Sequence, residues 1–168
     1  MYDYSVFVLN ENATINSSYG TGNSGVAINV LGESTRIYLN SSGHNFVSKG
    51  LIKSNFSSSN IFINSGKYFS YKNYHTVITE GKIIVKGGFI GSILIGENGN
   101  LDLIGGIIGD ENERLITAPI EIFGKAELKT GIIKAVKGVS VLVHKETNGE
   151  ISVEENKNID IKGKILYN

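Results

Sequence analysis

The chain has no cysteine and no tryptophan, and only one proline and one methionine among its 168 residues. Without cysteine it can form neither a disulfide framework nor a thiolate metal site. Its 16 basic and 16 acidic residues give a formal net charge of zero, so it lacks the positive surplus of a nucleic-acid-binding protein. It also has no run of 18 apolar residues and no Lys/Arg-rich cluster. We therefore expect no nucleic-acid partner, no anionic membrane partner and no membrane insertion of this segment.

Strand-forming residues dominate what is present. The chain contains 24 Ile and 12 Val against 11 Leu and 5 Ala. β-Branched side chains are stiff and suit a pleated surface. The 21 Gly and the many Asn and Ser residues tolerate the left-handed backbone of turns. No stretch has a clean 3.6-residue apolar period, so the sequence predicts an all-β fold.

Short alternating apolar stretches recur with a regular separation. They begin at Ala13, Thr35, Asn60, Lys82, Asn100, Ala126 and Glu150. Successive starts lie 18 to 26 residues apart, with a mean of about 23. Four of the stretches are followed by a glycine-containing turn and a second apolar stretch, and a third usually follows after a variable loop. Three short strands per repeat with Gly at the first corner describe a solenoid coil.

The sequence therefore predicts a single-stranded parallel β-helix solenoid of about seven coils, forming one domain over residues 1–168. Residues 1–12 are expected to be a leading strand or a partial coil. Neither end shows an amphipathic helix to cap the sheet edges, which favours a segment of a longer protein or one completed by another subunit. A β-sandwich, with its short strands at similar spacing, is the competing architecture, and the Asn98-Gly99 and Asn148-Gly149 pairs could then be hairpin tips.

Two IxVxGGxI-like units, Ile-Ile-Val-Lys-Gly-Gly-Phe-Ile at residues 83–90 and Leu-Asp-Leu-Ile-Gly-Gly-Ile-Ile at residues 101–108, resemble the right-handed parallel β-helix family of pectin-lyase-like repeat proteins. The resemblance covers residues 13–168. That family includes polysaccharide lyases, phage tailspikes and bacterial surface proteins such as autotransporter passengers, so the resemblance implies the fold and does not select an activity. Residues 93–99 also look like bactofilin repeats, although bactofilin coils are shorter and more uniform.

Side chains alternate along a strand, so the coil pattern predicts which residues face inward. The inward positions should be Ile37, Leu39, Ile61, Ile63, Ile83, Val85, Leu101, Leu103, Ala126, Leu128, Ile151 and Val153. The outward column between them should be Tyr38, Phe62, Ile84, Asp102, Glu127 and Ser152. This column changes from apolar to acidic along the chain, which makes it the first feature with functional content.

Aromatic residues are concentrated in residues 38–74, which hold eight of the fifteen. Rings beside Asn, Ser and Lys suit carbohydrate binding, because a ring covers the apolar face of a pyranose while polar groups bind its hydroxyls. The candidate ligand-binding residues are Tyr38, Phe62, Tyr68, Tyr71, Tyr74 and His75. The alternative is that these rings pack a loop onto the coil or line an interface with another chain.

Asp102 and Glu127 are the candidate catalytic residues. Equivalent positions one coil apart would place their carboxylates about 5 Å apart, the separation that a retaining glycosidase uses. The pair could also hold one Ca²⁺, as in the lyases that the fold resembles. Lys82, Lys86 and Lys129 are close enough in sequence to neutralise both charges. We therefore expect a solvated, salt-bridged ladder and no catalytic site.

Metal-ligand patterns are weak. Asp110, Glu111 and Glu113 form an acidic loop that could ligate Ca²⁺, but the alternating spacing of a calcium loop is absent. The three histidines, His44, His75 and His144, belong to different coils without paired-ligand spacing. No cofactor is predicted.

The expected function is a non-catalytic structural or adhesive module of a bacterial surface protein or phage fibre, located outside the cell. It would present its aromatic patch to a glycan or a cell-surface protein, and it could form a homotrimer or stack end to end. A polysaccharide lyase or glycoside hydrolase of the pectin-lyase-like fold is the alternative, and a cytoplasmic scaffold polymer of the bactofilin kind is a third. The first ten residues lack the basic and apolar regions of a signal peptide, so an exported protein would contain this chain as a mature or excised segment.

Overall fold

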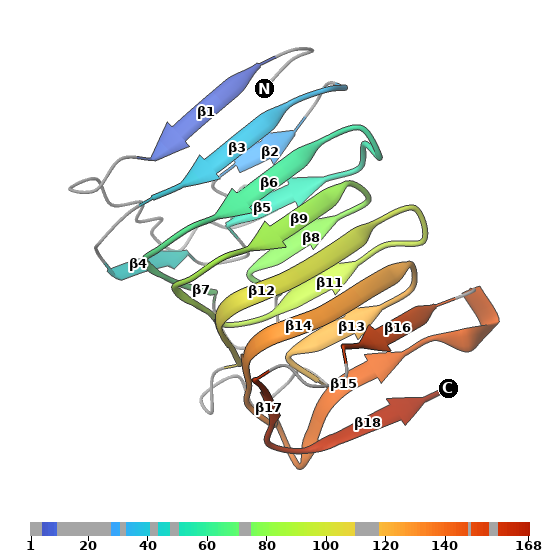
Figure 1. Cartoon of the computed structure of the whole chain (residues 1–168). Helices are drawn as coiled ribbons and strands as arrows, with labels where there is room; N and C mark the ends of the chain where they lie inside the picture. Colours follow the sequence, from blue (N-terminus) through green and yellow to red (C-terminus); the bar gives the residue numbers. More distant parts are fainter. Residues whose placement is uncertain are drawn as a thin grey trace.

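The chain folds as an all-β parallel solenoid with about 24 residues per turn. Figure 1 shows the computed structural model, in which the strands of successive turns lie side by side along one axis. The structure describes residues 5–9, 28–30, 33–40, 44–47, 51–70, 75–109, 118–147, 149–154 and 158–168. Among these residues the one helix is the short 3-10 helix η1 (Lys145–Thr147), and no helix is long and apolar enough to cross a membrane.

Two parallel sheets form the walls of the solenoid. Sheet A has 11 strands, and its broad wall contains β1 (Val6–Leu9), β3 (Arg36–Leu39), β6 (Asn60–Ile63), β9 (Lys82–Val85), β12 (Asn100–Ile108), β14 (Lys125–Ile133) and β16 (Glu150–Val153). Its remaining strands lie past the first corner and are β4 (His44–Val47), β7 (Lys67–Ser70), β10 (Phe89–Ile90) and β17 (Ile159–Ile161). β12 and β14 are long enough to continue past this corner, where they pair with β10 and β17.

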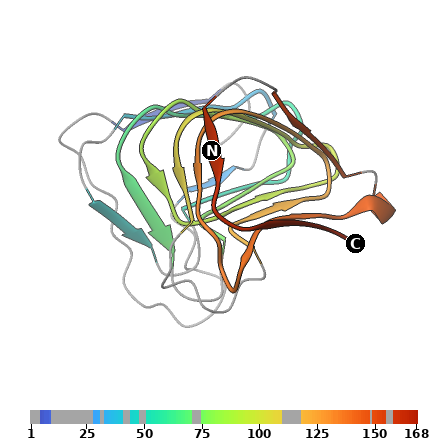
Figure 2. The same cartoon turned by 60° about the horizontal axis from the view of Figure 1, so that its bottom comes forward.

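Sheet B has seven strands and closes the turns on the other side. They are β2 (Ile28–Val30), β5 (Ile52–Ser54), β8 (Val77–Thr79), β11 (Ile93–Ile95), β13 (Ile120–Ile122), β15 (Val139–Val143) and β18 (Lys164–Tyr167). Figure 2 shows the turns overlying one another when the molecule is tilted. Every pairing between the strands of either sheet is parallel in the described residues. This excludes the β-sandwich alternative, which is built from antiparallel strands.

The prediction of about seven coils is wrong, because the solenoid has about four turns. The turns that begin with β6, β9, β12 and β14 have buried inward residues on both sheets. The rung that begins with β16 pairs with β14 but is covered by no described strand on its other side, so Val153 is 40% exposed where the equivalent Leu128 is fully buried. A strand-like stretch in the sequence was therefore not sufficient to indicate a closed turn.

The predicted facing of sheet A is confirmed over most of its length. The inward positions from Ile37 to Leu128 are at most 3% exposed, and the strand register places them one above another. The outward column is also confirmed as predicted, with Val8 added at its start. Ile151 and Val153 depart from the prediction, since Ile151 is half-buried and Val153 is exposed.

The glycine corners are confirmed by the backbone conformation. Gly66, Gly88, Gly106 and Gly131 have φ angles of 100°, 86°, 84° and 128° at the first corner of successive turns. Gly66 and Gly88 follow β6 and β9, whereas Gly106 and Gly131 lie within the long strands β12 and β14. The left-handed region disfavours residues with a Cβ atom. These four glycines allow the chain to turn the first corner of each coil while staying in contact with the coil before it.

The tight two-residue turn lies elsewhere than at the two Asn-Gly pairs that a β-sandwich would use as hairpin tips. Asn98-Gly99 is not a hairpin tip, because it joins β11 of sheet B to β12 of sheet A, and the Gly99 N–H donates to the Gly96 carbonyl at 2.9 Å. Asn148 lies outside the described residues. The antiparallel bridge in the described part of the chain joins Val136 and Val139 around Lys137 and Gly138, whose φ angles are both positive. Two positive φ angles in a two-residue loop are typical of a type I′ turn.

Candidate functional site

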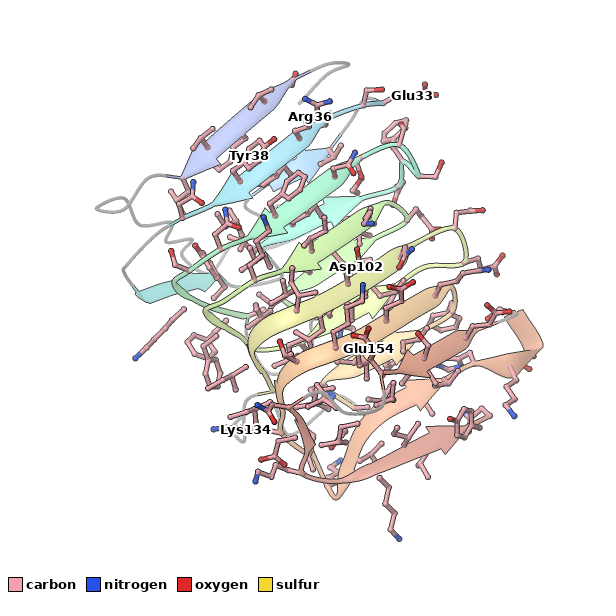
Figure 3. All side chains as sticks on the ribbon, viewed as in Figure 1. Glu33, Arg36, Tyr38, Asp102, Lys134 and Glu154 are labelled. Carbon is pink, nitrogen blue, oxygen red and sulfur yellow. The ribbon has the colours of Figure 1, made fainter. Side chains whose placement is uncertain are left out.

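The outward column of sheet A carries an aromatic pair. Tyr38 on β3 and Phe62 on β6 are register partners, and their rings are stacked with centroids 4.7 Å apart and planes 7° apart. Both side chains are half-buried, and Figure 3 shows Tyr38 on the broad wall. Because the rings cover each other along the solenoid axis, a ligand approaching from solvent meets their edges first. The parallel register itself produces this stack.

An amide pair lies two residues further along the same strands. The Asn64 side-chain Nδ2 donates to Asn40 Oδ1 at 2.6 Å, and the Asn64 Oδ1 atom is buried without a hydrogen-bond partner. An unsatisfied buried acceptor is unfavourable unless a donor reaches it. The aromatic pair and the amide pair therefore place apolar rings next to hydrogen-bonding groups on one wall.

The rest of the predicted ligand-binding set does not join this pair. Tyr68 is fully buried in the core, so its assignment to a surface patch is wrong: it occupies an inward position of β7 between the outward residues Lys67 and Phe69. Tyr71 and Tyr74 lie outside the described residues. His75 has a side chain only 11% exposed and lies near sheet B, beside Glu121.

The two candidate catalytic carboxylates are ion-paired. Asp102 and Glu127 are register partners on β12 and β14, as predicted. Lys82 Nζ lies 2.7 Å from Asp102 Oδ2, and Lys129 Nζ lies 2.8 Å from Glu127 Oε2. The hydrogen bond that the Lys129 ammonium donates to Glu127 is the main cause that raises the pKa of Lys129, and the charges of Glu127, Asp102 and Glu154 raise it further. The arrangement matches the salt-bridged ladder that we expected.

The two ion pairs should differ in their contribution to the free energy of unfolding, because their carboxylates differ in exposure to water. The Asp102 side chain is 14% exposed and the Glu127 side chain is 50% exposed. We expect Asp102→Asn to lower the free energy of unfolding by about 1 kcal/mol, because the carboxylate that it removes is largely shielded from water while its partner Lys82 is 42% exposed. Glu127→Gln should change it by less than about 0.5 kcal/mol. Urea unfolding of both variants at neutral pH measures the difference, and equal losses would contradict the assignment.

Sequence analysis missed a cluster on the outer side of sheet B. The two oxygens of the Glu121 carboxylate face different histidines, with His75 Nε2 3.7 Å from one and His144 Nε2 3.8 Å from the other. All three side chains are at most 14% exposed, and the His144 ring stacks on Phe123 with centroids 3.9 Å apart. These residues come from three different turns and lie 46 and 23 residues apart, so the repeat of about 23 residues is the sequence signal that could have found the cluster.

Burial controls the protonation of His75. Desolvation lowers its pKa from 6.5 to about 4. The Glu121 carboxylate would favour the charged imidazole, but its 3.7 Å separation is longer than a hydrogen bond, so burial dominates. His75 is therefore neutral at pH 7, and Nδ1 is buried without a hydrogen-bond partner.

The described residues contain no group of three His, Cys, Asp or Glu side chains placed to hold a metal ion. The predicted calcium loop with Asp110, Glu111 and Glu113 lies outside those residues. Comparison with known proteins adds no assignment, since no family model, no curated protein and no solved structure matches the chain. The strand pairing shows a parallel β-solenoid, and no family is identified.

Proposed function

We propose that the chain is a non-catalytic structural and adhesive solenoid module that presents the broad wall of sheet A to a glycan. The observation that carries this proposal is the stacked Tyr38–Phe62 pair beside the hydrogen-bonded Asn40–Asn64 pair. Ring edges and neighbouring amides offer the apolar contacts and hydrogen bonds that sugars use. The parallel ladder holds these groups at fixed spacing, which reduces the entropy lost on binding.

The setting follows from the fold as an expectation. A solenoid whose turns contact only their neighbours forms a stiff rod and suits display on a cell surface or a virion fibre. We place the module in an extracellular bacterial surface protein or phage fibre, of the right-handed β-helix kind that the sequence resembles. A partner protein is the second ligand class that the same wall could accept.

The enzymatic alternative has less support. A retaining glycosidase needs one carboxyl as a proton donor and the other as a free nucleophile. Asp102 is held by Lys82 at 2.7 Å and Glu127 by Lys129 at 2.8 Å, so both carboxylates are already engaged. Incubation with a panel of acidic and neutral polysaccharides, with and without Ca²⁺, should yield no new reducing ends or unsaturated products. Product formation that disappears in Asp102→Ala would overturn the non-catalytic assignment.

Glycan binding is tested by substitution of the stacked ring. Phe62→Ala should weaken binding to glycans selected on an array by about twofold to tenfold, because an aromatic contact contributes roughly 0.5–1.5 kcal/mol beyond its area. Ile84→Ala is the matched control, since Ile84 is the next residue in the same outward column and is also half-buried. The control should bind like the unaltered chain.

Two results would count against the aromatic wall. Equal binding by Phe62→Ala and the unaltered chain would mean that the ring stack has a packing role alone. Equal weakening by Phe62→Ala and Ile84→Ala would mean that ladder stability, and not ring chemistry, controls binding. Circular dichroism at the assay temperature checks that each variant remains folded.

A further inference from the structure

The edge of β16 is the last hydrogen-bonding edge of the broad wall in the described part of the chain. β16 pairs with β14 alone, whereas β14 itself has a parallel partner on both sides. Figure 1 shows β16 beside β14 as the last strand of that wall. The N–H and C=O groups along such an edge can pair with another extended chain.

Inward side chains along this edge are also incompletely covered. Val153 is 40% exposed and Ile151 is half-buried, although the equivalent residues Leu128 and Ala126 on β14 are at most 3% exposed. A hollow of about 510 Å³ includes Ile151 in its lining, and a second of about 250 Å³ includes Val153. Both hollows include Ser152, so they extend along the whole strand. A further strand would cover both side chains.

The pairing of β14 with β16 shows what chemistry this wall uses. β14 reads Lys-Ala-Glu-Leu-Lys over residues 125–129, and the facing segment reads Glu-Ile-Ser-Val-Glu over residues 150–154. Lys125 Nζ lies 3.2 Å from Glu150 Oε2, and the Glu154 charge raises the pKa of Lys129. Lys125 thus faces Glu150 at the start of the two strands, the apolar pairs Ala126–Ile151 and Leu128–Val153 follow, and Glu154 adds to the negative charge around Lys129.

The same complementarity defines the strand that fits the open edge. Glu150 and Glu154 favour basic residues at both ends of an incoming strand, and Ile151 and Val153 favour apolar residues at the two inward positions. The chain's own first strand is a poor match, because β1 reads Val-Phe-Val-Leu and has no basic residue. Charge complementarity therefore favours a strand from a different protein over head-to-tail stacking of this chain.

We propose that the β16 edge binds an extended segment of a partner protein with the pattern basic–apolar–any–apolar–basic, which adds to sheet A as a further parallel strand. Backbone hydrogen bonds would provide affinity, and the two acidic and two apolar positions would provide specificity. This surface is separate from the Tyr38–Phe62 wall, so it does not rest on the glycan-binding proposal.

Synthetic peptides test the proposal on the intact chain. The first probe contains Lys-Ile-Ser-Val-Lys between glycines, and the second contains Glu-Ile-Ser-Val-Glu. Titration followed by fluorescence anisotropy and amide NMR shifts should show binding of the lysine peptide at least about tenfold tighter than the glutamate peptide. The shifts should centre on residues 150–154. Tighter or equal binding of the glutamate peptide, or shifts located elsewhere, would overturn the proposal.

A charge-reversed protein supplies the control. The double variant Glu150→Lys, Glu154→Lys should lose its preference for the lysine peptide and prefer the glutamate peptide. A scrambled peptide of the same net charge should not bind either protein.

Light scattering over a concentration series tests whether a second copy of the chain occupies the edge instead. A dimer of the unaltered chain that the double variant abolishes would assign the edge to a second copy and overturn the partner assignment. The Phe62→Ala variant should bind the lysine peptide normally, which separates this result from the glycan proposal.

Discussion

Gly88→Ala is expected to lower the free energy of unfolding by about 2–5 kcal/mol, a large share of the stability of a domain of this size. Gly88 has a φ of +86°, and a Cβ at this position would lie 2.7 Å from the Gly66 carbonyl oxygen and 3.0 Å from the Ser65 carbonyl carbon. A left-handed alanine costs about 1–2 kcal/mol. The overlap with backbone atoms, which can move only by separating two turns, adds about 1–3 kcal/mol.

Gly138→Ala is the matched control for this prediction. Gly138 has nearly the same conformation, with a φ of +83°, but a Cβ there would meet nothing within 4 Å. The substitution should therefore cost only the conformational term, about 1–2 kcal/mol. Denaturant unfolding followed by circular dichroism measures both values. If the two variants lose equal stability, close stacking of the glycine corners does not contribute and the left-handed backbone explains the whole effect.

The glycine corners and the facing of the broad wall could be predicted from sequence because both depend on local periodicity. Alternation along each strand determines that Ile83 faces inward and Ile84 outward, and a glycine after each strand indicates the corner. Tyr68 could also have been placed correctly by alternation. Its segment reads outward Lys67, inward Tyr68, outward Phe69 and inward Ser70. The density of aromatic residues predicts a surface patch instead, but density does not distinguish a buried ring from an exposed one.

The number of turns could not be predicted in this way, since it depends on contacts between turns. Whether Val153 is buried depends on a covering strand, and its own segment, Glu-Ile-Ser-Val, alternates as regularly as the segment of any closed turn. The histidine cluster does follow the repeat, because Glu121 lies 46 residues after His75 and 23 residues before His144, and both separations are multiples of the mean repeat of about 23 residues. The repeat length therefore indicates that the three side chains share one side of the solenoid, which paired-ligand spacing within a single strand does not reveal.

His75 should make the fold sensitive to mild acid. Its pKa is about 4 in the folded chain and 6.5 in the unfolded chain. Between these values the unfolded state binds more protons than the folded state, so stability rises with pH. The contribution of neutral His75 is complete above pH 6.5 and is lost as the pH falls toward 4. The difference of about 2.5 pKa units corresponds to about 3 kcal/mol.

The test compares unfolding free energies of the unaltered chain and His75→Gln from pH 7.5 to 4. Glutamine keeps a polar group near the position of Nε2 but cannot titrate, so the variant should lose about 3 kcal/mol less over this range. Carboxylates that titrate below pH 5 affect both proteins equally and cancel in the comparison. His144→Gln retains His75 next to Glu121 and should keep the acid sensitivity of the unaltered chain.

An NMR titration of the His75 imidazole separates burial from the influence of Glu121. A midpoint near pH 4 would mean that removal from water outweighs a carboxylate 3.7 Å away. A midpoint above pH 6.5 would mean that the carboxylate dominates, and the sign of the effect would then reverse. Protonation would stabilise the fold, and stability would fall as the pH rises through that midpoint. The two outcomes predict opposite slopes of the unfolding free energy against pH. The imidazole midpoint from the titration must therefore agree with the sign of the slope in the unfolding series.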